Sequence, residues 1–121
     1  MPILVSKTVA EKPVVWLGSS RDDLLAFPAD ARQVAGFQLW RVQCGLEPND
    51  WKPLPTVGLG VREIRVRTGV GHRVVYLATF EEAVYVLHAF EKRSQRTPKR
   101  ELELARQRLR ALLKQRPRGG R

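Results

Sequence analysis

The spacing of apolar residues changes several times along the chain, and each change marks an expected element. The first clear pattern is the short apolar run of residues 13–17, which ends at Gly18 and is typical of a strand. Ser19 and Ser20 follow, and after them come Arg21, Asp22 and Asp23. Because hydroxyl residues cap helices and acids stabilise their first turn, this arrangement predicts a short helix over residues 21–27.

A longer helix is expected between Pro28 and Cys44. Proline suits a first helical turn, apolar side chains cover a wide face through to Cys44, and Gly45 favours a stop. The apolar residues of this helix, including Cys44, are interpreted as core. The next stretch, residues 45–60, holds three prolines and three glycines. It is predicted to be irregular and to lie across the surface with Trp51 as its anchor.

Three strand-like runs follow, at residues 61–68, 73–78 and 83–90. The first alternates between a charged face and an apolar face, as a half-buried strand does. A glycine-rich turn at residues 69–71 joins it to the second run. The spacing of the three runs predicts an antiparallel meander.

The chain is expected to end in a charged amphipathic helix. Thr97 is the expected N-cap and Pro98 the first helical residue. The apolar stripe of this helix comprises Leu102, Ala105, Leu109 and Leu112. Residues 1–12 are interpreted as an arm, residues 13–115 as one domain and residues 116–121 as a disordered basic tail. The order of strand, two helices, three strands and helix predicts an α+β fold, a small curved antiparallel sheet flanked by helices.

Positive charge is concentrated at the C-terminal end of the chain. The net charge is +10, and residues 1–90 hold ten Lys and Arg against nine Asp and Glu, whereas residues 91–121 hold twelve against three. The two parts therefore carry +1 and +9. A one-sided positive field attracts polyanions and speeds encounter with them. The pattern favours contact with nucleic acid or the ribosome; an acidic protein partner and a merely solvated basic surface stay open as alternatives.

Several other classes of protein are disfavoured by the composition. The single cysteine, Cys44, excludes an internal disulfide framework and favours a reducing, cytoplasmic setting. No apolar run approaches the roughly 18 residues of a membrane span, and the first residues do not have the layout of a signal peptide. His72, His88 and Cys44 form no recognised metal-ligand spacing, and no glycine-rich phosphate loop is present. Neither a metal nor a cofactor is therefore expected.

A set of cationic and titratable residues on the expected sheet indicates phosphodiester chemistry. Guanidinium and ammonium groups stabilise the charge that builds on a phosphate, and a group that titrates near neutral pH moves the proton. In RNA the 2′-hydroxyl supplies the nucleophile, so the protein need not. Neighbouring strands lie about 5 Å apart, so residues on different strands can converge. The set comprises Arg65, Arg67, Arg73, Tyr76, His88 and Lys92.

The members of this set also have structural interpretations. His88 alternates with Val84, Val86 and Phe90, so it fits a core position as well as a site. Tyr76 fits the core with its hydroxyl in water. Both interpretations of His88 stay open at this point.

Arg65 and Arg67 also fit a solvent-facing side of the sheet. Glu63 shares their face and is interpreted as their ion-pair partner rather than as a base. The arginines therefore point either to a site or to a soluble surface.

Four stretches of the chain, taken in order, resemble a known family. They are "WLGSSRDDLLAFPADAR", "DWKPLPTVGLGVREIRVR", "RVVYLA" and "VYVLHAFEKRSQRTPKRELELARQR". Within residues 13–114, they resemble the HigB-like toxins of the RelE/ParE superfamily, in the subgroup first described among phage-derived proteins. The most specific part is Leu87-His88-Ala89-Phe90 followed by Lys92, Gln95 and Thr97-Pro98.

The resemblance implies a fold like that of a microbial ribonuclease and the toxin half of a type II toxin–antitoxin pair. Typical members enter the ribosomal A site and cleave translated messenger RNA as endoribonucleases without a metal ion. The implied partners are the ribosome, messenger RNA and a cognate helix-turn-helix antitoxin, and no membrane. A non-cleaving toxin of the same superfamily that inhibits a topoisomerase is an alternative, as is a non-enzymatic nucleic-acid-binding phage protein.

The resemblance also assigns residues. Arg73 matches the arginine of the family's "R-V-x-Y" strand, which often contacts the scissile phosphate, and Arg65 matches the arginine of "R-E-I/L-R". Lys92 lies where the superfamily places a basic residue after its last strand, and His88 belongs to the subgroup phrase without a settled role. The predicted catalytic set is Arg73, His88, Lys92 and Arg65. The predicted RNA- and ribosome-binding set is Arg67, Arg93, Arg96, Lys99, Arg100 and Lys52.

The hinge between the last strand and the last helix departs from the family pattern. The usual hinge is richer in lysine, whereas here Arg93, Ser94 and Arg96 are present. Arginine keeps the charge and adds bidentate phosphate geometry, so binding is expected to survive. The general base is not assigned, because the catalytic groups of the superfamily vary.

Overall fold

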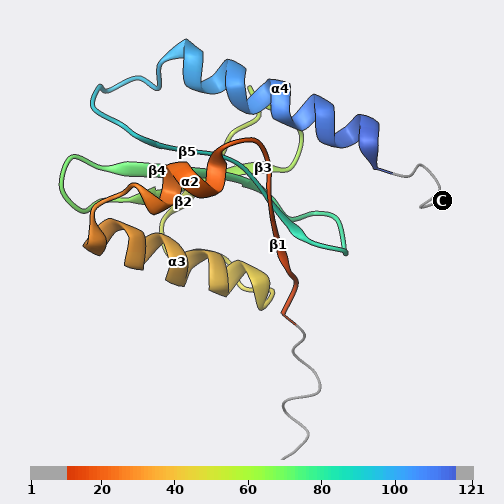
Figure 1. The fold of residues 1–121 in the computed structure, drawn as a ribbon, viewed down its shortest axis with the longest axis horizontal. Coiled ribbons are helices and arrows are strands. Elements are labelled where there is room, and N and C mark those ends of the chain that lie inside the picture. The colour runs from red at the N-terminus through yellow and green to blue at the C-terminus, as the bar shows by residue number, and fades with distance from the viewer. Residues whose placement is uncertain (1–10, 117–121) are drawn as a thin grey trace, which may run out of the picture.

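A five-stranded sheet separates the helices of this protein into two layers (Figure 1). The computed structural model describes residues 11–116. The strands in chain order are β1 (Val14–Trp16), β2 (Trp51–Pro53), β3 (Val61–Val66), β4 (His72–Leu77) and β5 (Val84–Glu91). Across the sheet their order is β1-β5-β4-β3-β2. The predicted α+β fold with a curved sheet is confirmed.

The sheet is mixed rather than purely antiparallel. β1 pairs in parallel with β5, while β5, β4, β3 and β2 pair antiparallel in turn. Parallel neighbours need a long crossover connection, which the helices and the meander between β1 and β5 supply. The predicted three-stranded meander is therefore the centre of a larger sheet with one added strand at each edge.

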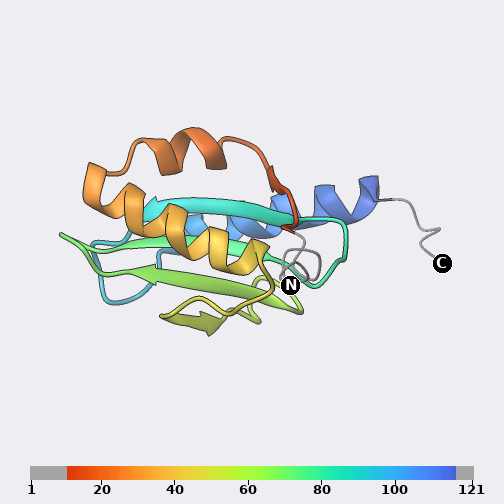
Figure 2. The ribbon, with the colours of Figure 1, turned by 90° about the horizontal axis from the view of Figure 1, so that it is seen from below.

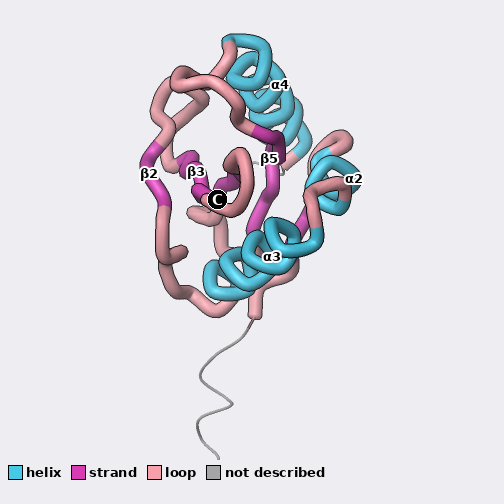
Figure 3. The backbone as a smooth tube through the Cα atoms, turned by 90° about the vertical axis from the view of Figure 1, so that its left-hand side faces the viewer, coloured by secondary structure: helices cyan, strands magenta, loops and turns pink. Residues whose placement is uncertain are grey.

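The helices cover opposite faces of this sheet. α2 (Ser20–Leu25) and α3 (Ala29–Gln43) lie on one face, and α4 (Lys99–Gln115) lies on the other. Figure 1 shows α4 above the sheet and α3 below it. In Figure 2, α3 crosses in front of the strands and α4 lies behind them, and the end-on view of Figure 3 shows the same separation.

Each face of the sheet buries its own apolar core. The face under α2 and α3 buries Ile64, Val66, Val74, Tyr76, Val84, Val86 and Ala89. The face under α4 buries Val61, Val75, Leu77, Tyr85, Leu87 and Phe90. Three residues of the predicted helical stripe, Ala105, Leu109 and Leu112, pack against this second face, with Leu102 partly buried beside them. Because both faces are covered, β5 is buried almost throughout.

A β-bulge in β5 decides where His88 lies. Val75 pairs with His88 and Tyr76 pairs with Val86, so Leu87 is an extra residue with no partner of its own in the β4–β5 register. Residues paired across antiparallel strands lie on the same face, so His88 faces α4 as Val75 does. The simple alternation that grouped His88 with Val84 and Val86 is therefore wrong, because one inserted residue reverses the faces beyond it.

Some element boundaries differ from those predicted. The proline-rich stretch after α3 contains a short strand, β2, which pairs antiparallel with β3 and places Trp51 opposite Ile64. α4 begins at Lys99 with Pro98 as its N-cap, so the helix starts one residue later than the Thr97 cap predicted. Proline fits there because its fixed φ suits the extended backbone of the cap residue.

Both ends of the described chain are fixed by polar contacts. The Lys12 backbone N–H donates to the Gln43 carbonyl at 2.9 Å, and its amino group donates to the Ala78 and Phe80 carbonyls. Arg116, which was predicted to begin a disordered tail, instead donates to Glu82 at 2.6 and 3.0 Å. The rest of the predicted arm and tail, residues 1–10 and 117–121, lies outside the described residues.

The contact between Arg116 and Glu82 predicts an unusually low pKa for the Glu82 carboxyl. Hydrogen bonds from Arg116 and then Tyr85 lower the pKa of Glu82 from 4.5 to about 2. The pKa of Glu82 is lower in the folded protein than in the unfolded chain. The contact therefore stabilises the folded protein above about pH 4.5, and this stabilisation is lost as the pH falls through about 2. We expect carboxyl-carbon NMR titration to find this low pKa and Arg116→Gln to raise it towards 4.5. An unchanged Glu82 titration in that variant would show that the helix end is not held by this contact.

Candidate nucleic-acid interface

A basic groove lies between β2, the hinge that follows β5 and the start of α4. The hinge comprises residues 92–98, between the end of β5 and the first residue of α4. The groove has a volume of about 420 Å³. Its polar wall consists of Lys52, Thr56, Lys92, Gln95, Arg96 and Thr97. Three cations from two separate parts of the chain therefore meet in one groove.

Next to this groove, two arginines are directly opposite each other on neighbouring strands. Arg65 of β3 pairs with Arg73 of β4. Like charges in such positions destabilise a sheet unless other groups compensate them. Asp50 compensates one side, because its carboxylate accepts a hydrogen bond from Arg65 Nε at 3.1 Å and another from Arg67. The bond from Arg67 is the main reason that the pKa of Asp50 is lowered.

Glu63, which is buried, compensates the positive charge of Arg73. Its side chain is 0% exposed, and its carboxylate lies 3.6 Å from Arg73 Nε and 3.8 Å from Lys52 Nζ. Neither carboxylate oxygen has a hydrogen-bond partner within residues 11–116. Glu63 was expected to pair with Arg65 and Arg67, and this is wrong, because the register of the sheet turns it towards Lys52 and Arg73. One buried anion thus holds two cations near the groove.

Arg73 is the most enclosed cation of this region. Its side chain is 14% exposed, and its Nη1 donates to the His72 carbonyl at 3.0 Å. Burial lowers the pKa of Arg73, and the nearby Glu63 carboxylate partly offsets that effect. A guanidinium that has already lost much of its water and is held in place suits the binding of an anion.

Lys92 joins the sheet to the hinge. Its backbone N–H donates to the Gly71 carbonyl at 3.0 Å, beyond the last residue pair of β4 and β5. Its amino group donates to the carbonyls of Ser94 and Gln95, each at 2.6 Å. Burial and then the charge of Arg73 lower the pKa of Lys92. Lys92 therefore shapes the hinge and brings positive charge close to Arg73.

His88 lies apart from this groove. Its Nε2 is 2.6 Å from the Glu101 carboxylate in the first turn of α4, and Arg108 Nη1 is 3.3 Å from its Nδ1. The imidazole is 5% exposed and stacks on the Phe90 ring at 5.1 Å. Phe90 stands between His88 and Lys92 along β5, and four residues of strand span roughly 13 Å. A separate hollow of about 370 Å³ contains His88 instead, together with His72 and Glu101.

The remaining predicted binding residues lie in different places. Arg96 lines the groove, whereas Arg93 extends into solvent and pairs with Glu91 at 2.9 Å. Lys99 and Arg100 line another hollow farther along α4. The structure thus brings together Lys52, Lys92 and Arg96, with Arg73 behind them, and separates the others from this group.

Four polar residues of the site were not predicted as members of it: Asp50, Thr56, Gln95 and Thr97. Asp50 was missed because it lies in a proline-rich loop, where no periodicity indicates which strand it meets. Thr97 was predicted as a helix cap, yet it lines the groove. The sequence carries no signal for the Asp50 contact, because the pairing of residues 51–53 with β3 cannot be seen in a stretch interrupted by prolines.

Within residues 11–116, no three or more His, Cys, Asp or Glu side chains are grouped so as to hold a metal ion. No helix in the same range is long and apolar enough to cross a membrane.

Comparison with known protein families gives one match. The family model described as "Phage derived protein Gp49-like (DUF891)" matches residues 22–110. This range includes α3, all of the sheet except β1, the hinge and most of α4. A comparison with curated protein sequences finds no match.

The buried position of Glu63 predicts a large effect on folding. Glu63→Gln leaves Arg73 and Lys52 without their shared counter-ion, and breaking a buried ion pair from one side costs about 3 kcal/mol. We expect urea denaturation to show a loss of that size. Asp50→Asn is the matched control, because it also removes one carboxylate that serves two cations, but Asp50, Arg65 and Arg67 are all more exposed, so the loss is expected to be less than about 1 kcal/mol. Equal losses in the two variants would contradict the organising role of Glu63.

Proposed function

Since the chain belongs to the phage-derived Gp49-like family, a family of RelE/ParE-like toxins, we propose that it is a HigB-like toxin of a type II toxin–antitoxin pair. The proposed activity is that of a metal-independent endoribonuclease that cleaves messenger RNA during translation. The observation that carries this proposal is the groove in which Lys52, Lys92 and Arg96 meet beside the partly buried Arg73.

The proposed reaction is a transesterification within the RNA. The 2′-oxygen loses its proton and bonds to the adjacent phosphorus, and the bond from phosphorus to the 5′-oxygen breaks. The 5′-oxygen takes up a proton, so the products are a 2′,3′-cyclic phosphate and a 5′-hydroxyl. Negative charge builds on the non-bridging oxygens, and Arg73 and Lys92 are the groups proposed to stabilise it. Arg65 supports this field from the neighbouring strand.

His88 is proposed as a positioning residue rather than as the proton-transfer group. Its buried contacts join β5 to Glu101 and Arg108 of α4. Because the hinge runs between β5 and α4, these contacts limit where Lys92 and Arg96 can lie. The distance along β5 and the Phe90 ring between them argue against a shared phosphate for His88 and Lys92.

The partners follow from the same proposal. The ribosome presents the messenger RNA, and the basic residues of the hinge contact ribosomal or messenger phosphates. A helix-turn-helix antitoxin encoded beside this chain neutralises it. The proposed location is the cytoplasm, where translating ribosomes are found.

The proposal predicts growth arrest with cleaved message. Expression without an antitoxin should stop growth, and mapping of RNA ends should find new 5′-hydroxyl ends only while ribosomes translate the message. Arg73→Ala should reduce cleavage by about 100-fold or more, because it removes a preorganised cation next to the phosphate. Arg21→Ala, on the exposed surface of α2, is the matched control and should cleave as the parent does.

Two results separate the proposal from its alternatives. Intact message together with inhibited supercoiling would favour a topoisomerase inhibitor. Salt-dependent RNA binding without new ends would favour a non-enzymatic binding protein.

The proposed role of His88 has its own test. His88→Gln should lower the stability of the protein and the rate of RNA cleavage, while the pH profile of cleavage should stay unchanged. A lost pH dependence with unchanged stability would instead make His88 the proton-transfer group.

A further inference from the structure

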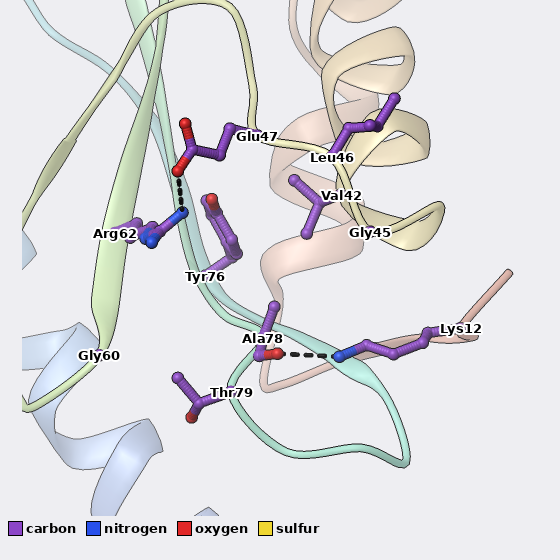
Figure 4. Close-up of a pocket in the computed structure, with 10 residues that line it drawn as sticks. All are labelled: Lys12, Val42, Gly45, Leu46, Glu47, Gly60, Arg62, Tyr76, Ala78 and Thr79. Carbon is purple, nitrogen blue, oxygen red and sulfur yellow. Dashed lines mark hydrogen bonds and ion pairs between the residues drawn. The ribbon is translucent and has the colours of Figure 1, made fainter. Parts of the chain in front are cut away.

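Another hollow lies on the opposite face of the sheet from the basic groove, and Figure 4 shows the residues that line it. It has a volume of about 330 Å³ and lies between the end of α3, the loop that follows it and the strands β3 and β4. Ligand pockets for small molecules start at about this size. Its walls include the apolar side chains of Val42, Leu46 and Ala78. Neither the toxin family nor the proposed cleavage requires a hollow here.

The Tyr76 hydroxyl is an unusual group to find beside this hollow. Tyr76 is 1% exposed, and its hydroxyl has no hydrogen-bond partner among the residues that the structure describes. Burial raises the pKa of Tyr76, and the nearby Arg62 partly offsets that effect. A tyrosine hydroxyl is protonated at neutral pH, so it can donate a hydrogen bond to an acceptor. A buried hydroxyl without a partner is unfavourable, so its retention calls for an explanation.

Arg62 lies beside this hydroxyl with its charge only weakly paired. Its guanidinium lies over the Trp51 ring, 4.0 Å from the ring centroid, which fixes its position. Its ion pair with Glu47 is long, at 3.9 Å, and the two side chains are 36% and 66% exposed. Exposed pairs of this kind contribute little. Figure 4 shows the Tyr76 hydroxyl next to the Arg62–Glu47 pair, so these two side chains cover it.

We propose that this hollow binds a small organic carboxylate with a short apolar body. The ligand carboxylate takes the place of the Glu47 carboxylate at Arg62 and accepts a hydrogen bond from Tyr76. Its apolar body lies against Val42, Leu46 and Ala78. Glu47 thus acts as a resident competitor that an added carboxylate displaces, at little cost because Glu47 is mostly exposed.

The charge around the hollow agrees with an anionic ligand. Lys12 lies at its rim, where its amino group donates to the Ala78 carbonyl at 2.8 Å and the Phe80 carbonyl at 2.9 Å. Lys12 and Arg62 together outweigh the single negative charge of Glu47. The whole sheet separates this hollow from Arg73 and Lys92. A test of ligand binding in the hollow therefore does not depend on whether the protein cleaves RNA.

The experiment is a titration of the full chain followed by amide NMR shifts. The probes are benzoate and butyrate, with benzamide and benzyl alcohol as uncharged matches of the first. We expect saturable shifts at Gly45, Leu46 and Thr79 with the carboxylates, and at least about tenfold weaker binding of the uncharged probes. The absence of saturable shifts there, or equal binding of benzamide, would overturn the proposal.

Two substitutions with opposite expected effects make the test sharper. Arg62→Gln should weaken benzoate binding by at least about tenfold, whereas Glu47→Gln should tighten it about two- to fivefold by removing the competitor. Tyr76→Phe should fold normally, since it removes a hydroxyl without a partner, and should weaken binding. Arg110→Gln, at an exposed position of α4 on the other face of the sheet, should leave benzoate binding unchanged. Weaker binding in Glu47→Gln, or unchanged binding in Arg62→Gln, would sink the idea.

Discussion

The buried carboxylate of Glu63 is the contact on which the basic groove depends. Lys52 comes from β2 and Arg73 from β4, and Glu63 lies between them on β3. Without an anion in this position, Lys52, Arg65 and Arg73 would repel one another on three neighbouring strands. A buried ion pair seldom stabilises a protein compared with an apolar alternative. Its value here lies in fixing where the positive charges stand, which is what recognition of a phosphate requires.

The two-sided packing of the sheet explains why the groove lies at the end of β5. β5 is covered by α2 on one face and by α4 on the other, so a large ligand cannot reach its side chains along most of its length. Only beyond Phe90 does the chain leave the core, and Lys92 is the first cation after that point. The His88–Glu101 contact then sets the direction in which α4 returns. The cations of the groove therefore come from the hinge and from β2.

Much of the fold could be predicted from the sequence, because the apolar periods of the helices and of the meander are strong. The parallel pairing of β1 with β5 could not, and neither could two other features. The bulge at Leu87 leaves no local signal, yet it moves His88 to the other face of the sheet. The strand β2 lies among prolines, and only its pairing with β3 makes it regular. Both depend on contacts between distant residues, which periodicity along one segment does not report.

The candidate site shows the same limit. Arg73, Lys92 and Lys52 were identified from residue type and resemblance, and the structure brings them close together. Their counter-ions were assigned wrongly or missed, because the register of three strands decides which carboxylate meets which cation. Charge content can thus be predicted from a sequence more readily than charge pairing.

The most direct test of this account is to map where RNA lies on the protein. A short RNA with a 2′-O-methyl group at every ribose cannot be cleaved through its 2′-oxygen, so it can be titrated against the full chain while amide NMR shifts are followed. The account predicts that the largest shifts occur at Lys52, Lys92, Gln95 and Arg73. Shifts confined to the outer face of α4, with none along β2 and the hinge, would contradict it.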